Sequence, residues 1–160
     1  MTVEKELYDD EALAKMRLEQ EDPYVQYIII NKDLEMGCGK IAAQVGHGCG
    51  MHILEYKRLS KIVNRYLDNM DLVSKPEDFN IKSNNVTNTY KWIDESFRKI
   101  VKVAHKKEFD KIKELTEVDC FLVKDAGLTE VAAGEETVLV LWPILRSQCP
   151  KIIQKLQLLK

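Results

Sequence analysis

Hydrophobic positions along the chain fall into continuous runs and helical spacings, which predict a series of strands and helices. The run VQYIIIN over Val25–Asn31 is apolar at nearly every position, as expected for a strand buried on both faces. A polar loop follows over Lys32–Gly39, and the small residues after it predict a helix over about Lys40–Leu59. Gly37 and Gly39 bracket the sharp turn from strand to helix.

The second half of the chain predicts the remaining elements. The pattern indicates a strand, FRKIVKVA, with its lysines facing outward, a helix over Lys106–Glu117, strands over Cys120–Val123 and Thr137–Trp142, and a final helix over about Gln148–Leu159 with Ser147 as its N-cap. The resulting order is β-α-(α)-β-α-β-β-α. It predicts an α/β fold with three layers, α/β/α, around a mixed four-stranded sheet.

The composition of the chain predicts one domain with an acidic arm. At 160 residues, the length suits a single domain, which we place at 24–160, after an acidic N-terminal arm at 1–23. The arm is either a solvated tail or a docking segment for a partner. Residues 60–89 form a polar inserted or extended segment, whose first half extends or follows the preceding helix and which we expect to be loop beyond Pro76.

Charge is distributed unevenly. The formal net charge is -2, but residues 1–22 hold eight carboxylates against three bases, which leaves 18 acids and 21 bases, or +3, in the remainder. A mildly basic domain can present a local phosphate-binding patch.

The sequence also bears on location. No apolar run approaches the roughly 20 residues of a membrane span, and the N-terminus lacks the features of a signal peptide. The four cysteines are too few for a secreted disulfide scaffold, so we expect free thiols in a reducing compartment. We therefore expect a cytoplasmic protein with no membrane contact.

A polar stripe marks the predicted first helix. Lys40, Gln44 and His47 share one helical face, because residues three or four apart lie above one another. A lysine at a helix N-terminus is opposed by the macrodipole unless a carboxylate or phosphate lies near it. The alternative is a solvated helix face with a satisfied histidine.

Asp125 is the candidate carboxylate for this stripe. It follows the strand Cys120–Val123 at its carboxyl end, where ligand sites gather in open α/β sheets. If this strand and the first strand are parallel neighbours, Asp125 and Lys40 can meet, with Thr129 and Thr137 nearby. Such a group could orient water and stabilise an oxyanion. The alternative for Asp125 is a turn former before Ala126–Gly127.

Three sharper motifs are not supported. The segment MGCGKI resembles the end of a phosphate-binding loop, but Glu35 stands where the first glycine is needed and Ile41 replaces the hydroxyl residue. Zinc binding by Cys38, His47, Cys49 and His52 lacks the usual paired spacing, so we expect no metal and no cofactor. Cys38 lies near a helix N-terminus, but no arrangement with a histidine recommends it as a nucleophile.

Two separated motifs, MGCGKIAAQVGHG and KDAGLTEVAAGEETVLVL, together with the ending KLQLLK, resemble the archaeal and eukaryotic type of peptidyl-tRNA hydrolase. The resemblance spans about Val25–Leu159, with 60–89 longer and poorly matched. It implies a four-stranded α/β domain, usually a homodimer, that cleaves the ester between peptide and tRNA without metal and so recycles tRNA from stalled or prematurely released products. It places the catalytic positions at Lys40, His47, Asp125, Thr129 and Thr137, and substrate-binding positions at Gln44, Gly39 and Gly127.

The chain departs from the family pattern at the rim of the site. Similar proteins have lysine where Glu35 and Cys38 stand here, and a Gly-Pro segment where this chain has Leu141-Trp142-Pro143-Ile144. The lost lysines should weaken contact with the tRNA backbone. We expect Asp125, held by Thr129, to position or deprotonate water and Lys40 to offset oxyanion or phosphate charge. A non-catalytic RNA- or protein-binding adaptor on the same fold is the alternative.

Overall fold

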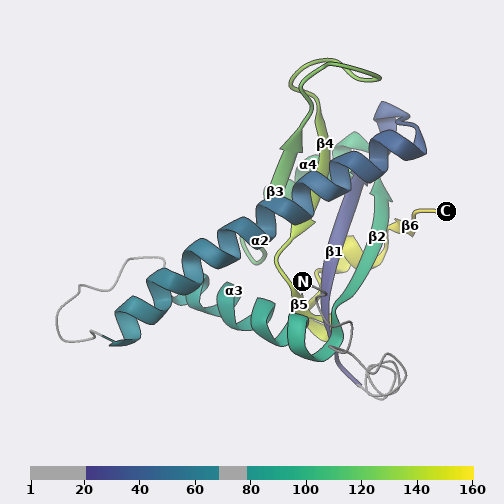
Figure 1. Cartoon of the computed structure of the whole chain (residues 1–160). Helices are drawn as coiled ribbons and strands as arrows, with labels where there is room; N and C mark the ends of the chain where they lie inside the picture. The colour runs from purple at the N-terminus through teal and green to yellow at the C-terminus, as the bar shows by residue number, and fades with distance from the viewer. Residues whose placement is uncertain (1–20, 69–78) are drawn as a thin grey trace, which may run out of the picture.

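Strand β1 (Tyr24–Asn31) lies in the middle of a mixed sheet in the computed structural model, which describes residues 21–68 and 79–160. It pairs in parallel with β2 (Arg98–Ala104) and antiparallel with β4 (Glu136–Leu141). β3 (Cys120–Lys124) pairs antiparallel with β4, so the sheet has the order β3-β4-β1-β2-β6 (Figure 1). The α/β class is confirmed, with a mixed sheet as expected.

The sheet has six strands, so the prediction of four is wrong. The additional strands, β5 (Ile144–Leu145) and β6 (Gln157–Leu158), have two residues each and pair antiparallel with β1 and β2. Two residues carry no readable alternation of apolar and polar positions, so a hydrophobic pattern cannot reveal such strands.

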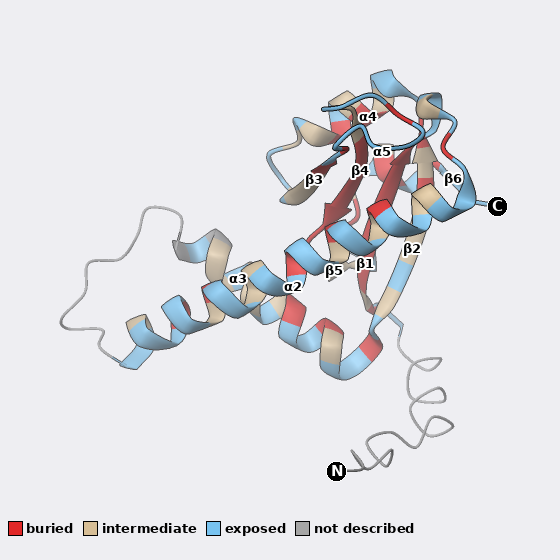
Figure 2. Cartoon of the chain, turned by 45° about the horizontal axis from the view of Figure 1, so that its top comes forward, coloured by how far each residue is buried: buried red, intermediate tan, exposed pale blue. Residues whose placement is uncertain are grey.

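Alternate residues of β1 supply the two halves of the core. Tyr27 and Ile29 pack with α4 (Lys106–Lys113) and α5 (Lys151–Gln154), whereas Ile28 and Ile30 lie on the face covered by α2 (Cys38–Asp68). The central strands are therefore buried on both sides (Figure 2). This explains the continuous apolar run that β1 shows in the sequence.

The polar segment 60–89 contains more helix than its sequence suggests. α2 begins at Cys38 and continues to Asp68, as one of the two expectations had it, and α3 (Phe79–Lys91) lies where we expected loop. α3 lies beside the distal part of α2 (Figure 1), and a single π-helical turn over Trp92–Ser96 leads from it into β2. No helix within the described ranges is long and apolar enough to cross a membrane.

The C-terminal helix is much shorter than predicted. After a 3-10 turn at Arg146–Gln148, α5 covers only four residues, Lys151–Gln154. Lys102 faces inward rather than outward, and its ammonium donates to the main-chain oxygens of Gln154 and Leu156, both at 2.9 Å. A buried cation at these carbonyls stabilises the helix end, after which the chain extends into β6.

Two smaller predictions are also corrected. α4 ends at Lys113 rather than Glu117, and Phe109 and Ile112 are fully buried on its core face. Ser147 does not cap a helix: its hydroxyl and main-chain N–H donate to the Asp22 carboxylate, at 2.6 and 2.8 Å. Residues 1–20 of the acidic arm lie outside the described part of the chain.

A buried histidine joins α2 to the sheet and to α3. The Gln26 amide nitrogen lies 3.0 Å from Nδ1 of His52, and Nε2 of His52 lies 3.0 Å from the Thr89 hydroxyl. Because an amide NH2 can only donate, Nδ1 accepts and Nε2 carries the proton. The ring is also enclosed by Trp92 and Trp142. Burial lowers the pKa of His52 to about 4.

Replacing Gly48 with alanine should destabilise the protein, because α2 packs too closely on the sheet there to leave room for a side chain. A Cβ at Gly48 would lie 2.4 Å from Val140 Cγ2 and 3.1 Å from Val123 Cγ2. We expect Gly48→Ala to reduce the free energy of unfolding by about 1–3 kcal/mol. Gly46→Ala is the control: no atom lies within 4 Å of its Cβ position, so helix propensity should raise stability by up to about 1 kcal/mol. Urea unfolding midpoints check both, and equal shifts would contradict the close approach.

The free energy of unfolding should fall as the pH drops from about 6.5 to 4, in part through His52. In the unfolded chain His52 takes up a proton near pH 6.5, whereas in the folded chain it does so only near pH 4. The difference between the two pKa values corresponds to a loss of about 3 kcal/mol in the free energy of unfolding across this pH range. His52→Gln should be less stable at pH 7 but show a shallower loss on acidification. Denaturant unfolding at a series of pH values measures this, and identical slopes would contradict it.

Candidate active site

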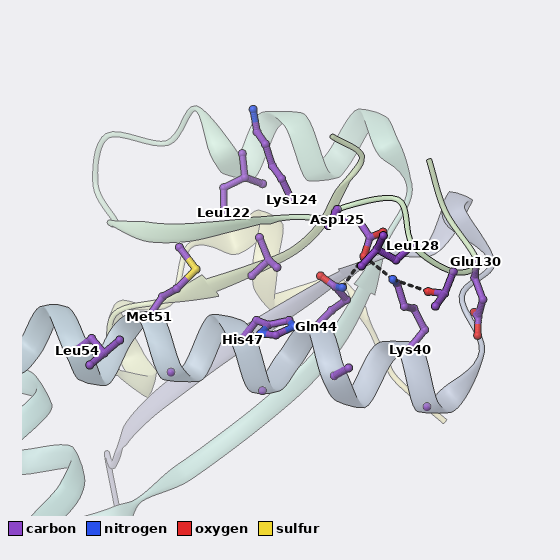
Figure 3. Close-up of a pocket in the computed structure, with 17 residues that line it drawn as sticks. Lys40, Gln44, His47, Met51, Leu54, Leu122, Lys124, Asp125, Leu128 and Glu130 are labelled. Atoms are coloured by element: carbon purple, nitrogen blue, oxygen red, sulfur yellow. Dashed lines mark hydrogen bonds and ion pairs between the residues drawn. The ribbon is translucent and has the colours of Figure 1, made fainter. Parts of the chain in front are cut away.

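A cleft of about 1010 Å³ runs between α2 and the end of β3. Lys40 and Asp125 line one end of it, and Met51 and Leu54 line the other (Figure 3). Thr129 also lines the cleft and contacts Lys40. Polar chemistry is therefore concentrated at the end where α2 begins, and the cleft continues beyond it along an apolar wall.

The turn before α2 fixes Lys40. A 3-10 turn over Lys32–Leu34 follows β1 and ends at Glu35, whose φ of 47° reverses the chain. The Gly37 N–H then donates to the Glu130 carboxylate at 2.6 Å, and the Gly37 carbonyl accepts from Ile41 N at 3.0 Å. These contacts anchor the first turn of α2, from which the Lys40 side chain points across the cleft.

The connection between β3 and β4 fixes Asp125. The main-chain N–H of Asp125 donates to Glu135 O at 2.9 Å, and its carbonyl accepts from Gly134 N at 2.7 Å. Gly127 has a φ of +76°, and a Cβ there would lie 2.5 Å from Ala133 N, so only glycine fits. In this turn the Gly127 N–H donates to Asp125 Oδ1 at 2.7 Å.

The negative charge of the Asp125 carboxylate is balanced by three donors, Lys40, Gln44 and Gly127. The Asp125 side chain is only 3% exposed, and its Oδ2 forms an ion pair with the Lys40 ammonium and accepts from the Gln44 amide at 2.7 Å. The Lys40 hydrogen bond and the Gly127 N–H are the main causes that lower the pKa of Asp125 below its ordinary value. Asp125 is therefore an anion at neutral pH and a weak proton acceptor.

Two threonines hold the side chains that contact Asp125. Thr137 is fully buried, and its hydroxyl can donate to Gln44 Oε1, at 2.9 Å, or to Val123 O, at 3.1 Å. Contact with Gln44 Oε1 directs the amide nitrogen toward Asp125. Thr129 accepts from the Lys40 ammonium at 2.8 Å, so it holds the lysine rather than Asp125 itself.

The other predicted positions line the cleft without joining this hydrogen-bonded group. His47 is exposed, lies between Gln44 and Met51 in Figure 3, and forms no hydrogen bond with another described residue. Gly39 is exposed at the polar end. The group that the structure brings together consists of Lys40, Gln44, Asp125, Gly127, Thr129 and Thr137.

Lys40 and Asp125 meet by a route that the sequence did not suggest. β1 and β3 are not neighbours, because β4 lies between them. The two side chains meet because α2 packs across β4 and β3. Lys40 therefore reaches Asp125 because α2 crosses the sheet, and not because β1 and β3 are adjacent strands.

Sequence reasoning missed part of the lining. Glu130, Met51 and Leu54 were not singled out, and neither was Leu128. A signal for two of them existed, because Met51 and Leu54 continue the spacing of Lys40, Gln44 and His47 by four and three residues. Their apolar character concealed it, since exposed apolar residues at helical spacing look like core.

The cysteines and histidines considered for zinc are dispersed. Cys38 is exposed, Cys49 is partly buried, and all four cysteines are free, as expected. Among residues 21–68 and 79–160, no three His, Cys, Asp or Glu side chains lie close enough together to hold a metal ion.

Comparisons with known proteins give one consistent result. The family model described as peptidyl-tRNA hydrolase PTH2 matches residues 24–159. The peptidyl-tRNA hydrolase of Methanococcus vannielii is 29% identical over 140 residues, covering 85% of this chain and 99% of that protein. The one from Thermoplasma acidophilum is 32% identical over 136 residues, covering 82% and 95%. The probable peptidyl-tRNA hydrolase 2 of Drosophila melanogaster is 28% identical over 142 residues, covering 86% and 63%.

Removing the lysine should raise the pKa of Asp125. The Lys40 hydrogen bond is the largest cause of the lowered pKa, so Lys40→Met leaves the buried carboxylate with Gln44 and Gly127 alone. Lys124→Met is the control, because Lys124 lines the same cleft but its ammonium is not among the groups that lower the pKa of Asp125. Carboxyl-carbon NMR titration of aspartate-labelled protein should show an upward shift in the first variant only. An unchanged Asp125 titration in Lys40→Met would contradict the ion pair.

Proposed function

Because the chain belongs to the peptidyl-tRNA hydrolase PTH2 family, whose members cleave the ester between peptide and tRNA, we propose that it performs this cleavage at the Lys40 end of the cleft. The chain is a hydrolase, and its substrate is peptidyl-tRNA. The observation that carries the placement of the site is the nearly buried ion pair between Lys40 and Asp125.

Lys40 supplies the positive charge that the reaction needs. An ammonium has three N–H donors, and two of them are used by Asp125 and Thr129. The third remains to bind the carbonyl oxygen of the ester as it becomes an oxyanion. Asp125 and Thr129 hold the ammonium in place before the substrate arrives, so little reorganisation is needed during the reaction.

Asp125 acts by orienting water rather than by removing its proton fully. General-base catalysis is most effective when the pKa of the base lies near the working pH, and the pKa of Asp125 is shifted the other way. The carboxylate can still accept a hydrogen bond from the attacking water. Water adds to the ester carbonyl, the bond to the ribose oxygen breaks, and the products are a peptide carboxylate with its proton released and a tRNA hydroxyl.

Four further residues shape the binding site for the substrate in this proposal: Gln44, His47, Gly39 and Gly127. Gln44 and Gly127 do so through Asp125, because the Gln44 amide and the Gly127 N–H both donate to its carboxylate. His47 lies exposed one helical turn beyond Gln44, where it can contact the peptide or the ribose. Gly39 leaves the mouth of the cleft open, with no atom within 4 Å of its Cβ position.

The chain carries less positive charge around the start of α2 than the family pattern that it resembles. Glu35 and Cys38 are both exposed at the start of α2, where similar proteins have lysine. We propose that tRNA is bound more weakly around the start of α2 for that reason. A non-catalytic adaptor function is not favoured by the family match.

We further propose that the protein acts as a homodimer in the cytoplasm. The support for the dimer is the resemblance to a family whose members are usually dimeric. The support for the location is the set of four free cysteines, which suits a reducing compartment.

Replacing either charge of the pair should reduce peptide release. We expect Lys40→Met and Asp125→Asn to lower kcat by about 10²–10³, the loss typical of removing an oxyanion-stabilising donor. Lys124→Met, a second lysine on the cleft wall, should retain activity close to the parent protein. The measurement is release of labelled peptide from purified peptidyl-tRNA. Full release by the Asp125 variant would remove the ion pair from the mechanism.

The pH dependence of the rate should separate Asp125 from His47. If the Asp125 anion orients water, kcat/KM should show no acid limb near pH 6.5, since the pKa of Asp125 lies below its ordinary 3.8. An acid limb between pH 5 and 8 that disappears in His47→Gln would assign water activation to His47 instead. Rates between pH 5 and 8 are sufficient for this test.

A further inference from the structure

One wall of the cleft is the free edge of a β-strand. Within residues 21–68 and 79–160, β3 pairs with β4 alone and ends the sheet. Leu122, Val123 and Lys124 of β3 line the cleft, and Asp125 follows them directly. The edge of β3 therefore leads straight to the proposed reaction centre.

The register shows which main-chain groups face outward. Trp142 N donates to Asp119 O at 3.0 Å, and these two residues lie opposite each other, next to the opposed pair Cys120 and Leu141. Because bonded and non-bonded pairs alternate in an antiparallel ladder, Phe121 and Val123 bond to β4, and Leu122 directs its N–H and carbonyl away from the sheet. The Leu122 side chain points away from α2 (Figure 3), so the strand presents its edge to the cleft.

The opposite wall is a smooth face of α2. Ala43, Gly46 and Gly50 line it, and no atom lies within 4 Å of a Cβ built at either glycine. Beyond them Met51 and Leu54 are 41% and 71% exposed. From Gln44 to Leu54 the helix rises about 15 Å, which matches four or five residues of extended chain at about 3.3 Å each.

We propose that the peptide of the substrate binds in this cleft as an added strand along the free edge of β3, hydrogen-bonded to Leu122. The inference rests on the proposed function. The ester lies at the carboxyl end of the peptide, and Asp125 lies at the carboxyl end of β3. The bound peptide therefore runs parallel to β3, with its earlier residues toward Leu54.

The character of the cleft selects peptide over RNA for this wall. Phosphates need cations, and the described lining offers only Lys40, already paired, and Lys124. Met51 and Leu54 suit apolar side chains. Main-chain pairing at a strand edge does not depend on side-chain identity. It therefore suits an enzyme whose substrates carry many different peptide sequences.

Peptide length tests this proposal. N-acetylated oligoalanyl-tRNAs with one to five alanines on the same tRNA should be cleaved with kcat/KM values that rise over the first three or four residues and then level. The expected total gain is about tenfold, as for one or two net main-chain hydrogen bonds. N-methylation of the alanine amide that pairs with Leu122, located by methylating each position in turn, should abolish the gain.

A matched pair of variants places the effect in the cleft. Gly50→Leu fills the α2 wall at a position where no atom lies within 4 Å of the added Cβ, and it should remove the gain with peptide length. Ala42→Leu puts the same side chain at an exposed position of α2 outside the cleft, and it should keep the gain. Circular dichroism and thermal unfolding verify that both variants are folded.

Three results would overturn the proposal. The first is a rate that does not depend on alanine number, and the second is a length gain that survives both N-methylation and Gly50→Leu. The third is a Gly50→Leu defect that is equal at all lengths and disappears with peptidyl-adenosine, which would assign this wall to the RNA strand. Failure of the proposed function looks different, because the unmodified protein would then release no peptide from any of these substrates.

Discussion

The structure depends at its functional end on the compensation of one nearly buried anion. The Asp125 side chain is 3% exposed, and a carboxylate removed from water without donors would take up a proton. Here the pKa is lowered instead, because donors arrive from two directions: Lys40 and Gln44 from α2, and the Gly127 N–H from its own turn. The anion therefore fixes the position of α2 relative to the β3–β4 connection.

This requirement explains the unusual buried face of α2. Gln44, Gly48 and His52 follow one another at four-residue intervals, and all three are buried. Gln44 reaches Asp125, the missing side chain of Gly48 allows contact with Val140, and His52 reaches Gln26 in β1. Buried faces of helices are ordinarily apolar. In α2 the sheet is approached through a glycine with a polar contact on either side, so the helix is placed by hydrogen bonds as well as by apolar packing.

The parts predicted from the sequence are those in which short-range pattern coincides with long-range contact. The apolar runs of β1, β3 and β4 gave their strands, and the spacing of Lys40 and Gln44, with Asp125 after a strand, gave the polar end of the cleft. α3 escaped prediction because its sequence, rich in Asn and Thr, favours helix weakly and it is held through the contact of Thr89 with His52. The final helix was overestimated because its apolar spacing continues to Leu159, whereas Lys102, distant in sequence, holds the carbonyls at which the helix ends. The partner of Thr129 likewise depends on how the 126–133 loop folds back, which no local pattern encodes.

The electrostatics of the cleft divide recognition between its two ends. Lys40 and Asp125 cancel each other's charge, so the proposed reaction centre has little net field to attract a phosphate, and Lys124 is the only other lysine among the described residues that line the cleft. Glu35, in the turn before α2, and Cys38, its first residue, are exposed and add no positive charge. The outward main-chain groups of the β3 edge and a smooth helix face remain, and both suit a peptide backbone. If the ester is cleaved at Lys40 and Asp125, as we propose, the contacts nearest the scissile bond suit the peptide better than the nucleic acid, and phosphate binding falls to basic residues outside the cleft.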